Sequence, residues 1–553
     1  MSSAADDAPA PSRLTSGALV QAPLPLVLVA AVVALTGLAM TFVGAGQTGL
    51  SADEYAHVKR LEAFYDDGLF VRSWERTTPE GTVPPNAYVY APATTRVMHA
   101  ANQLTGHEGP GEVSASAESF IVRHYVVAAM ALAGTLATFG LAWLLLGSWR
   151  WGVVAAAALA AVPMWTGHAM FNPKDTPVAV GNTLMTLGLA GLVVAASRRD
   201  RARPLMLAST CIVTFLGVGL MLGTRPGMWP ALAAAVVTLV FVLAVGRQLN
   251  RWVVAGLVAA LSASYMALWQ LYPKVFGNPV AMLVTSVGQS QQFPHGVAPG
   301  RGYIVERTAI EWPVLLLAFM LLGTLVGAIV CVRSMRADPP RSAVYGLVGV
   351  QAYALTLAAI ITGANVYDGL RQLLFAVPAQ AVLATVGMAV AVSVVQRGHL
   401  AWIVTGAAVA GLVLPTIVQA RLFPYQYAYG NVVAERAGAE ILNDNWKVSF
   451  REYVKDIPPT VKAVCPNTPP AGPPIKHENY SDCRGDSGAL KPHWIAYWHH
   501  ARYDPDAPTF YTVMRAQRPV PPNCRVVDRV VRNRNIERAV MSRLLLCAQA
   551  GVK

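Results

Sequence analysis

The chain has 553 residues, of which 54% are hydrophobic and only 13% are charged, and its mean hydropathy is +0.42. In soluble domains about a quarter of the residues are charged, so this composition excludes an ordinary soluble globular protein. The formal net charge of +13 would suit a nucleic-acid-binding protein, but the basic residues gather in short segments between long apolar runs. Short basic loops are typical of the cytoplasmic side of multi-span membrane proteins, so nucleic acid is not an expected partner.

The apolar runs predict a polytopic α-helical membrane body over residues 24–420. Crossing a ~30 Å hydrocarbon core takes roughly 20 apolar residues, and about eleven runs of that kind follow one another, the third of them short. The runs are Leu26–Val43, Tyr125–Leu146, Gly152–Trp165, Pro177–Ala196, Leu205–Leu222, Met228–Val245, Trp252–Gln270, Pro313–Val332, Ala343–Thr362, Leu373–Val395 and Leu400–Val418. Residues 1–23 are expected to form a disordered cytoplasmic tail, and residues 421–553 a small extracytoplasmic C-terminal domain of α/β or mixed structure.

The arginine groups predict which loops face the cytoplasm. Arginines at 198–203, 247–251 and 333–341 lie between pairs of apolar runs, which the positive-inside rule assigns to the cytoplasm. The alternate loops then lie outside, with a cytoplasmic N-terminus. These outer loops hold mixed acids, bases and amides, and the first of them, residues 44–124, has about 80 residues, a length usually found in functional loops. The sequence therefore predicts a polar site on the outer face of a cell membrane.

The first outer loop begins with a pair of carboxylates, Asp53 and Glu54. A neighbouring like charge raises one carboxyl pKa, so the pair could supply a general base. The alternative is a helix N-cap, with Ser51 or Asp53 as the capping residue. Apolar residues at helical spacing follow the pair and recur later in the loop, which predicts amphipathic helices lying in the membrane interface. They are Tyr55, Val58, Leu61 and Tyr65, and then Val97, Ala101 and Leu104.

Two further polar clusters open predicted spans on the same face. In the segment 167–177, His168, Asn172, Lys174 and Asp175 stand together, and a lysine there could hold a phosphate as a point charge. Snorkelling of the lysine to the interface is the alternative.

In the segment 365–372, Arg371 follows Asp368. An anionic headgroup would satisfy this arginine through forked hydrogen bonds, and so would an ion pair with Asp368 or Asp175. Arg225 raises the same question in a third outer loop.

The cysteines divide between the membrane body and the tail. Cys211 and Cys331 fall in apolar runs, where a small buried side chain is the simplest interpretation. The four tail cysteines suggest two disulfides in an oxidising compartment, and pairing of sequence neighbours gives Cys465–Cys483 and Cys524–Cys547. A zinc site is the alternative, although no CxxC spacing is present.

Four segments in order resemble the motifs of GT-C membrane glycosyltransferases, and in particular bacterial family 39 enzymes related to protein O-mannosyltransferases. They are Asp53-Glu54 with His57, the stretch Gly167–Pro177, the stretch Asp368–Phe375 with Pro378, and Phe423–Asn431 with Asn445-Trp446. The resemblance implies a polyprenyl-phosphate-linked sugar donor and an inverting displacement at the anomeric carbon. It implies that Asp53 is the base, with Glu54 orienting it and His57, Asn172, Asp175 and Asp368 in support.

In the same resemblance His168, Lys174 and Arg371 would neutralise the departing lipid phosphate. Arg225 is a further candidate for binding this phosphate, from its position in an outer loop. The acceptor is expected to be a glycan, a lipid or a protein. No cofactor is implied and no metal-ligand set is evident, although a divalent metal stays possible.

Two other functions fit the composition. A multi-span transporter would carry broken helices and polar residues near the bilayer midplane, whereas here only a few residues, Asn182 and Gln351 among them, stand inside the runs. A lipid-linked glycan polymerase or ligase would share the outward-facing site.

Overall fold

The computed structural model describes residues 21–72, 85–198, 203–291, 300–395, 399–453, 509–516 and 519–548. Within them, ten segments are helical, long and apolar enough to cross a membrane. They are α1 (Leu24–Gln47), α4 (Ala117–Leu146), α7 (Asp175–Ser197), α8 (Arg203–Thr224), α9 (Trp229–Val245) with the turn before it, α10 (Arg251–Leu271), α14 (Val314–Ala337), α15 (Pro339–Thr362), α16 (Val377–Val394) with the preceding 3-10 helix η4 (Arg371–Ala376), and α17 (His399–Leu422).

The predicted membrane body is confirmed, and so is the short length of its third run. That run forms α5 (Trp149–Ala160) and α6 (Pro163–His168), two helices too short to span a bilayer. Most of the predicted N-terminal tail lies outside the described residues. The shorter helices α11 (Pro273–Phe276), α12 (Pro279–Gln291) and α13 (Tyr303–Glu311) follow α10.

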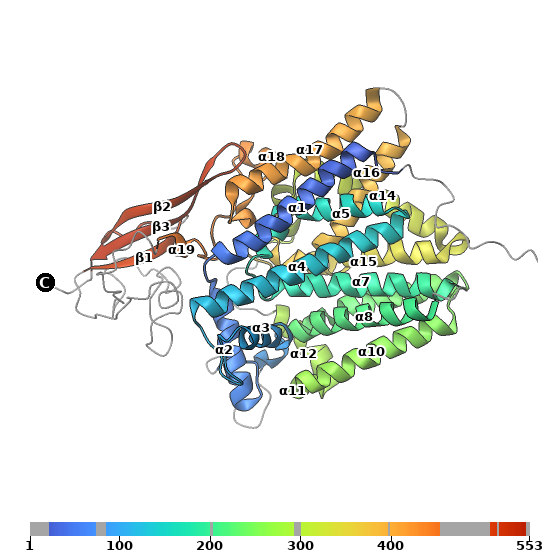
Figure 1. The fold of residues 1–553 in the computed structure, drawn as a ribbon, viewed down its shortest axis with the longest axis horizontal. Helices are drawn as coiled ribbons and strands as arrows, with labels where there is room; N and C mark the ends of the chain where they lie inside the picture. Colours follow the sequence, from blue (N-terminus) through green and yellow to red (C-terminus); the bar gives the residue numbers. More distant parts are fainter. Residues whose placement is uncertain are drawn as a thin grey trace, which may run out of the picture.

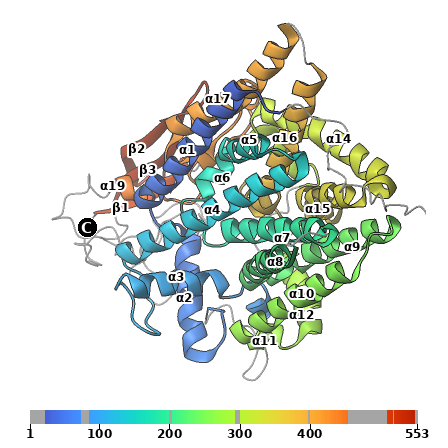
Figure 2. The ribbon, with the colours of Figure 1, turned by 45° about the vertical axis from the view of Figure 1, so that its right-hand side comes forward.

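The two sets of predicted loops lie at opposite ends of the helix bundle. The helices α2 (Ala52–Asp67) and α3 (Ala93–Leu104) and the C-terminal sheet share one end, at the left of Figure 1 and Figure 2. The junctions α7–α8, α9–α10 and α14–α15, which carry the arginine groups, lie at the other end. The bundle therefore has the polarity that the loops indicated, while the side that faces the cytoplasm stays a prediction.

Small residues let the central helices approach closely. α7 and α16 are mostly buried, whereas α8, α10 and α14 expose much of their apolar surface. A Cβ atom at Gly323 of α14 would stand 1.8 Å from the Leu383 carbonyl oxygen of α16, and one at Gly387 would stand 2.0 Å from the Phe319 carbonyl oxygen. Backbones pack this closely in membranes only where a side chain is absent. The packing fixes α16, whose preceding 3-10 helix begins at Arg371.

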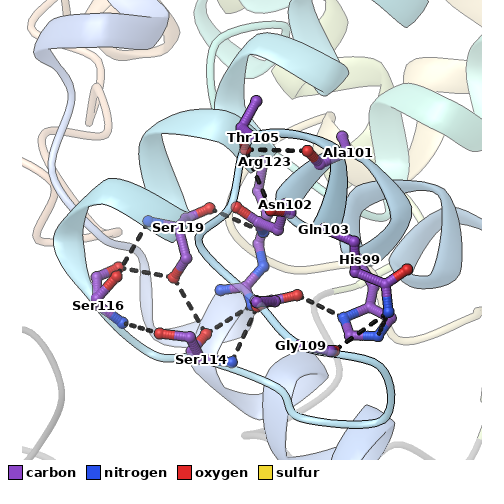
Figure 3. A network of polar contacts seen from close by, with 11 residues as sticks. His99, Ala101, Asn102, Gln103, Thr105, Gly109, Ser114, Ser116, Ser119 and Arg123 are labelled. Atoms are coloured by element: carbon purple, nitrogen blue, oxygen red, sulfur yellow. Dashed lines mark hydrogen bonds and ion pairs between the residues drawn. The ribbon is translucent and has the colours of Figure 1, made fainter.

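The first outer loop contains both predicted helices, but their apolar stripes face differently. Val58 and Leu61 of α2 are buried against the protein, whereas Val97 and Leu104 of α3 are exposed. The buried face of α3 is polar instead. There the Glu108 carboxylate contacts His99 Nδ1 at 2.5 Å and accepts hydrogen bonds from Arg123 and from the Ser114 N–H (Figure 3). This network ties α3 and the loop after it to α4, and leaves an apolar stripe free for the membrane interface.

The C-terminal segment, the part of the chain that follows α17, carries a three-stranded antiparallel sheet. Strands β1 (Thr509–Arg515), β2 (Cys524–Asn533) and β3 (Arg538–Ala548) lie in the order β1-β3-β2. The predicted disulfide Cys524–Cys547 is confirmed and joins β2 to β3. The other predicted pair, Cys465–Cys483, falls outside the described residues. Cys211 of α8 and Cys331 of α14 are free thiols.

The chain just before the sheet holds the start of the first outer loop. Arg451, in the short helix α19 (Phe450–Tyr453), donates to the carbonyl oxygens of Gly46 and Thr48 at 2.6 and 3.1 Å. The Gly49 N–H donates to the Val448 carbonyl oxygen at 2.9 Å. Since α2 begins three residues after Gly49, the C-terminal segment determines where Asp53 stands.

We expect Gly323→Leu to destabilise the protein by about 1–3 kcal/mol or more, because the new side chain would overpack the α14–α16 contact. Gly349→Leu in α15 is the matched control, since no atom lies within 4 Å of a Cβ atom built there. Thermal unfolding of the purified protein in detergent measures the effect. Equal melting temperatures for the two variants would contradict the close packing.

Candidate functional site

The start of α2 separates the roles of the two neighbouring carboxylates. Glu54 is buried, accepts a 2.7 Å hydrogen bond from the Ser51 N–H at the helix N-cap, and contacts His124 Nε2 at 2.6 Å. Ser51 is therefore the N-cap, one of the two capping residues predicted, and Glu54 completes the capping box. Asp53 points elsewhere: its side chain is 34% exposed and reaches cations from two other segments.

Four charged side chains meet where α2, α7 and η4 begin. Asp53 Oδ2 lies 3.0 Å from Lys174 Nζ and 3.3 Å from Arg371 Nη1. The same Arg371 Nη1 lies 3.3 Å from Asp175 Oδ2. Lys174, Asp175 and Arg371 are almost completely buried, so Asp53 is the member of the cluster most open to an incoming molecule. The structure therefore brings together residues 53, 174, 175 and 371, as the sequence predicted.

Asn172 organises the cluster around the start of α7. Its Oδ1 accepts the backbone N–H groups of Lys174 and Asp175 at 3.1 and 2.8 Å, so its Nδ2 must be the donor on the other side. That Nδ2 donates to Asp175 Oδ2 at 3.0 Å and lies 3.3 Å from His168 Nδ1. His168 Nδ1 is consequently an acceptor, which leaves the ring proton on Nε2.

The charge states of the cluster follow from burial and from the ion pairs. Desolvation alone would raise the pKa of Asp53, but the positive charges of Lys174 and Arg371 hold it well below its ordinary value. Desolvation would lower the pKa of Lys174, and the Asp53 charge raises it instead. Burial lowers the pKa of His168 to about 3. His168 is therefore uncharged at neutral pH, and its predicted contact with a phosphate would be a hydrogen bond without a charge.

A strained turn delivers Arg371 to the cluster. Asp368 and Gly369 both have positive φ angles, 55° and 74°, a conformation unfavourable for residues other than glycine. Two side chains of α13 hold the turn. The Gly369 N–H donates to the Tyr303 hydroxyl at 2.9 Å, and the Leu370 N–H donates to Glu311 Oε2 at 3.1 Å.

Aromatic rings and a further carboxylate surround the two cations. The Arg371 guanidinium stacks 4.2 Å from the Trp446 ring centroid and lies 3.5 Å from Asp368 Oδ2. The Tyr90 ring lies 5.5 Å from Lys174 Nζ. Such contacts favour a cation that is partly removed from water, and Trp446 brings the C-terminal segment into the site.

Two other predicted residues lie at the edge of the cluster. Arg225 Nη1 is 3.7 Å from Asp175 Oδ1, so it joins the group through a weaker ion pair. His57 is buried beside Tyr90 and Phe70, with ring centroids 5.1 and 6.1 Å apart. It supports α2 and does not contact the cations directly in any hydrogen bond that the described residues show.

A small hollow of about 20 Å³, room for about one water molecule, adjoins the cluster. Arg371 and His168 form one part of its wall, Asp368 and Glu311 another, and Asn443, Asn445 and Trp446 of the C-terminal segment a third. The hollow thus borders the cluster at Arg371 and His168. Among the described residues, no group of three or more histidine, cysteine, aspartate or glutamate side chains could hold a metal ion.

Several residues of the site were not predicted from the sequence. Tyr90, Tyr303 and Glu311 lie in loops predicted to be on the outer face, where a lone aromatic or acidic residue gives no periodic signal. Glu311 stands shortly before α14, at the end of a candidate span, and this position is the one feature that could have drawn attention to it.

The comparisons with known proteins give a likeness in structure only. No family model matches the sequence, and no curated protein matches it. The chain is similar to the crystal structure of ArnT from Cupriavidus metallidurans bound to undecaprenyl phosphate, with 14% identity, a TM-score of 0.47, and 96% of this chain and 99% of that chain covered. The apo state of the same ArnT gives 14% identity and a TM-score of 0.47 over 94% and 97% of the two chains. At this level no residue role is transferred from ArnT.

Glu311 provides a test of the site's electrostatics through stability. Burial raises its pKa to about 7, so the folded protein favours the protonated carboxyl. This contribution to stability is complete below the ordinary carboxyl pKa and is lost as the pH rises through 7. We therefore expect the melting temperature of Glu311→Gln, relative to the unsubstituted protein, to rise between pH 5 and pH 8. Glu306→Gln, an exposed position of the same helix, should show a constant difference. A constant difference for Glu311→Gln as well would contradict the raised pKa.

Proposed function

We propose that the protein is an inverting glycosyltransferase that moves a sugar from a polyprenyl-phosphate-linked donor to an acceptor hydroxyl on the outer face of the membrane. The observation that carries this proposal is the position of Asp53. One partly exposed carboxylate is paired with two buried cations, Lys174 and Arg371, at the membrane end that the loop charges assign to the outside.

The two cations supply the binding site for a lipid phosphate. Arginine offers a planar fork of donors and lysine a compact point charge, and together they suit a phosphate group. Arg225 adds a third positive charge nearby, and the His168 Nε2–H could add a hydrogen bond. Lys174 and Arg371 stand at the starts of two candidate membrane-spanning segments. A phosphate bound between them would therefore keep its lipid chain within reach of the bilayer.

The proposed reaction begins with an exchange of anions. In the structure Asp53 is the anion that pairs with Lys174 and Arg371, and a donor phosphate would compete with it for the same cations. Once these charges are shared with the phosphate, the Asp53 pKa rises toward a value useful for a general base.

The acceptor oxygen then attacks the anomeric carbon while the bond from that carbon to the phosphate oxygen breaks. The hydroxyl proton passes to Asp53, and the phosphate leaves with the electron pair, stabilised by Lys174 and Arg371. A single displacement of this kind inverts the anomeric centre.

The polar residues inside the spans favour this proposal over a transporter. Gln351 Nε2 donates to the Phe375 carbonyl oxygen at 3.2 Å, and Asn182 Nδ2 donates to the same oxygen at 3.3 Å. These amides satisfy a carbonyl group of the 3-10 helix η4, where the α-helical hydrogen-bond pattern has not yet begun. The bonds of the two nitrogens account for the position of these amides without a substrate pathway at the midplane, while Asn182 Oδ1 and Gln351 Oε1 have no partner among the described residues.

We expect Asp53→Asn to abolish transfer, with a loss of at least about 10³-fold in rate, the scale of general-base catalysis. Expression should be unaffected, and polyprenyl phosphate should bind at least as tightly as to the unsubstituted protein, because a competing anion is removed. Asp66→Asn, on the exposed part of the same helix, is the control. Transfer assays with membrane fractions and binding assays on the purified protein measure the two effects. Full activity of Asp53→Asn would contradict its role.

For Arg371→Ala we expect polyprenyl phosphate to bind at least about tenfold more weakly, since a charge-assisted bond contributes more than 1.4 kcal/mol. Arg336→Ala is the matched control, because Arg336 lies in the last turn of α14, at the end of the bundle away from the site. Isothermal titration with bare polyprenyl phosphate measures the affinity. Unchanged affinity for polyprenyl phosphate, together with weaker binding of the acceptor substrate, would count against the assignment of Arg371 to the phosphate.

A further inference from the structure

We propose that a groove between α14 and α17, at the end of the bundle where Asp53 stands, binds an anionic phospholipid of the surrounding membrane. The groove has a volume of about 490 Å³, within the range of about 300–1,000 Å³ that is typical of ligand sites. Its walls are the start of α14, the second half of α17, and the part of the C-terminal segment around Tyr429. It shares no residue with the hollow beside Arg371, so this inference does not depend on the proposed function.

The groove opens onto a surface that a bilayer would cover. α14 and α17 are both candidate spans, and only 22% and 33% of their most apolar windows are buried within the protein. On the wall of the groove, Leu414 and Ile417 of α17 are 57% and 45% exposed, and Val433 of the C-terminal segment is 59% exposed. Apolar side chains on the surface of a membrane span meet lipid chains. The molecule that reaches this groove from the membrane is therefore a lipid.

Two polar side chains on the wall indicate that this lipid carries an anionic headgroup. Arg421, in the last turn of α17, is exposed and makes no hydrogen bond or ion pair within the described part of the chain. Tyr429 is only 6% exposed, and its hydroxyl has no hydrogen-bond partner among the same residues. A buried hydroxyl without a partner is costly, so a ligand or a water usually satisfies it. A phosphate would accept the forked donors of the arginine and the O–H of the tyrosine.

The charge of the wall favours an anionic lipid over a zwitterionic one. The wall holds one cation, Arg421, and no carboxylate. The positive ammonium group of a zwitterionic headgroup would therefore find no opposite charge there, whereas an anionic headgroup needs none. Basic side chains at the membrane surface select anionic lipids for the same reason.

The C-terminal side of the groove is held in place without a ligand. Asn535, in the turn between β2 and β3, donates from Nδ2 to the Gly430 carbonyl oxygen at 2.7 Å and to Glu435 Oε1 of α18 (Val432–Arg436) at 2.6 Å. Asn431 Nδ2 donates to the Trp312 carbonyl oxygen at 3.0 Å, just before α14 begins. A groove that is already formed loses little conformational freedom when a ligand binds. The bound lipid would join both spans to the C-terminal segment.

The experiment is native mass spectrometry of the delipidated full-length protein in detergent, with phosphatidylglycerol and phosphatidylcholine of identical acyl chains as probes. The unsubstituted protein should bind phosphatidylglycerol at least about fivefold more tightly, the scale of one basic side chain at a membrane surface. Arg421→Ala should lose this preference. Arg525→Ala is the matched control, because Arg525 is exposed on β2 and is not part of the groove. It should keep the preference.

A second pair of variants fills the groove without changing its charge. Ala410→Phe places a ring on the wall and should weaken the binding of both phospholipids at least about fivefold, since it occupies the space of the chain. Gly406→Phe is its control, because Gly406 is exposed one turn earlier in α17 and no atom lies within 4 Å of a Cβ atom built there. It should bind both phospholipids as the unsubstituted protein does.

Four results would overturn the proposal. The first is equal affinity of the unsubstituted protein for the two phospholipids, and the second is the same behaviour of the two members of either pair of variants. Glycerol phosphate that binds as tightly as phosphatidylglycerol would show an anion site without a lipid. Polyprenyl phosphate that binds more tightly than phosphatidylglycerol, and loses this affinity in Arg421→Ala, would assign the groove to the donor lipid instead.

Discussion

The site depends on one guanidinium group. Arg371 pairs with Asp53 of the first outer loop and with Asp175 at the start of α7, each at 3.3 Å, and so joins three segments that are far apart in the sequence. Removing a partner from a buried charged group of this kind is costly, since the remaining charge loses its compensation. Much of the surrounding structure holds this arginine in place: the turn braced by α13, the stacked ring of Trp446, and the close packing of α14 on α16.

The C-terminal segment is part of the same construction. It places Trp446 over Arg371, and its Arg451 fixes the backbone from which α2 and Asp53 follow. The sheet in turn is joined to this segment, for instance by the 2.8 Å hydrogen bond from Asn443 Nδ2 to the Val540 carbonyl oxygen. The C-terminal segment and its sheet therefore form part of the site together with the membrane body.

The sequence allowed the fold class to be predicted because spans and loops carry strong signals. Apolar length predicted the helical membrane body, arginine clusters predicted which loops share an end, and neighbouring cysteines predicted the bond Cys524–Cys547. Within the site, Asp53, Lys174, Asp175 and Arg371 were predicted and do meet. The Ser51-x-x-Glu54 spacing is a local capping-box pattern, but the burial of Glu54 against His124, which lies 70 residues away in α4, was not predictable. Glu311 and Tyr303 were missed because their partners are backbone groups of a turn with positive φ, a conformation that the sequence announces only weakly.

The central claim is that Asp53 occupies the place where a lipid phosphate binds. A structure of the protein with polyprenyl phosphate, determined by cryo-electron microscopy in lipid nanodiscs, tests it most directly. The account predicts that the phosphate lies between Lys174 and Arg371 and that the Asp53 carboxylate has separated from both. A phosphate bound elsewhere, with the pairs of Asp53 to Lys174 and Arg371 intact, would contradict it.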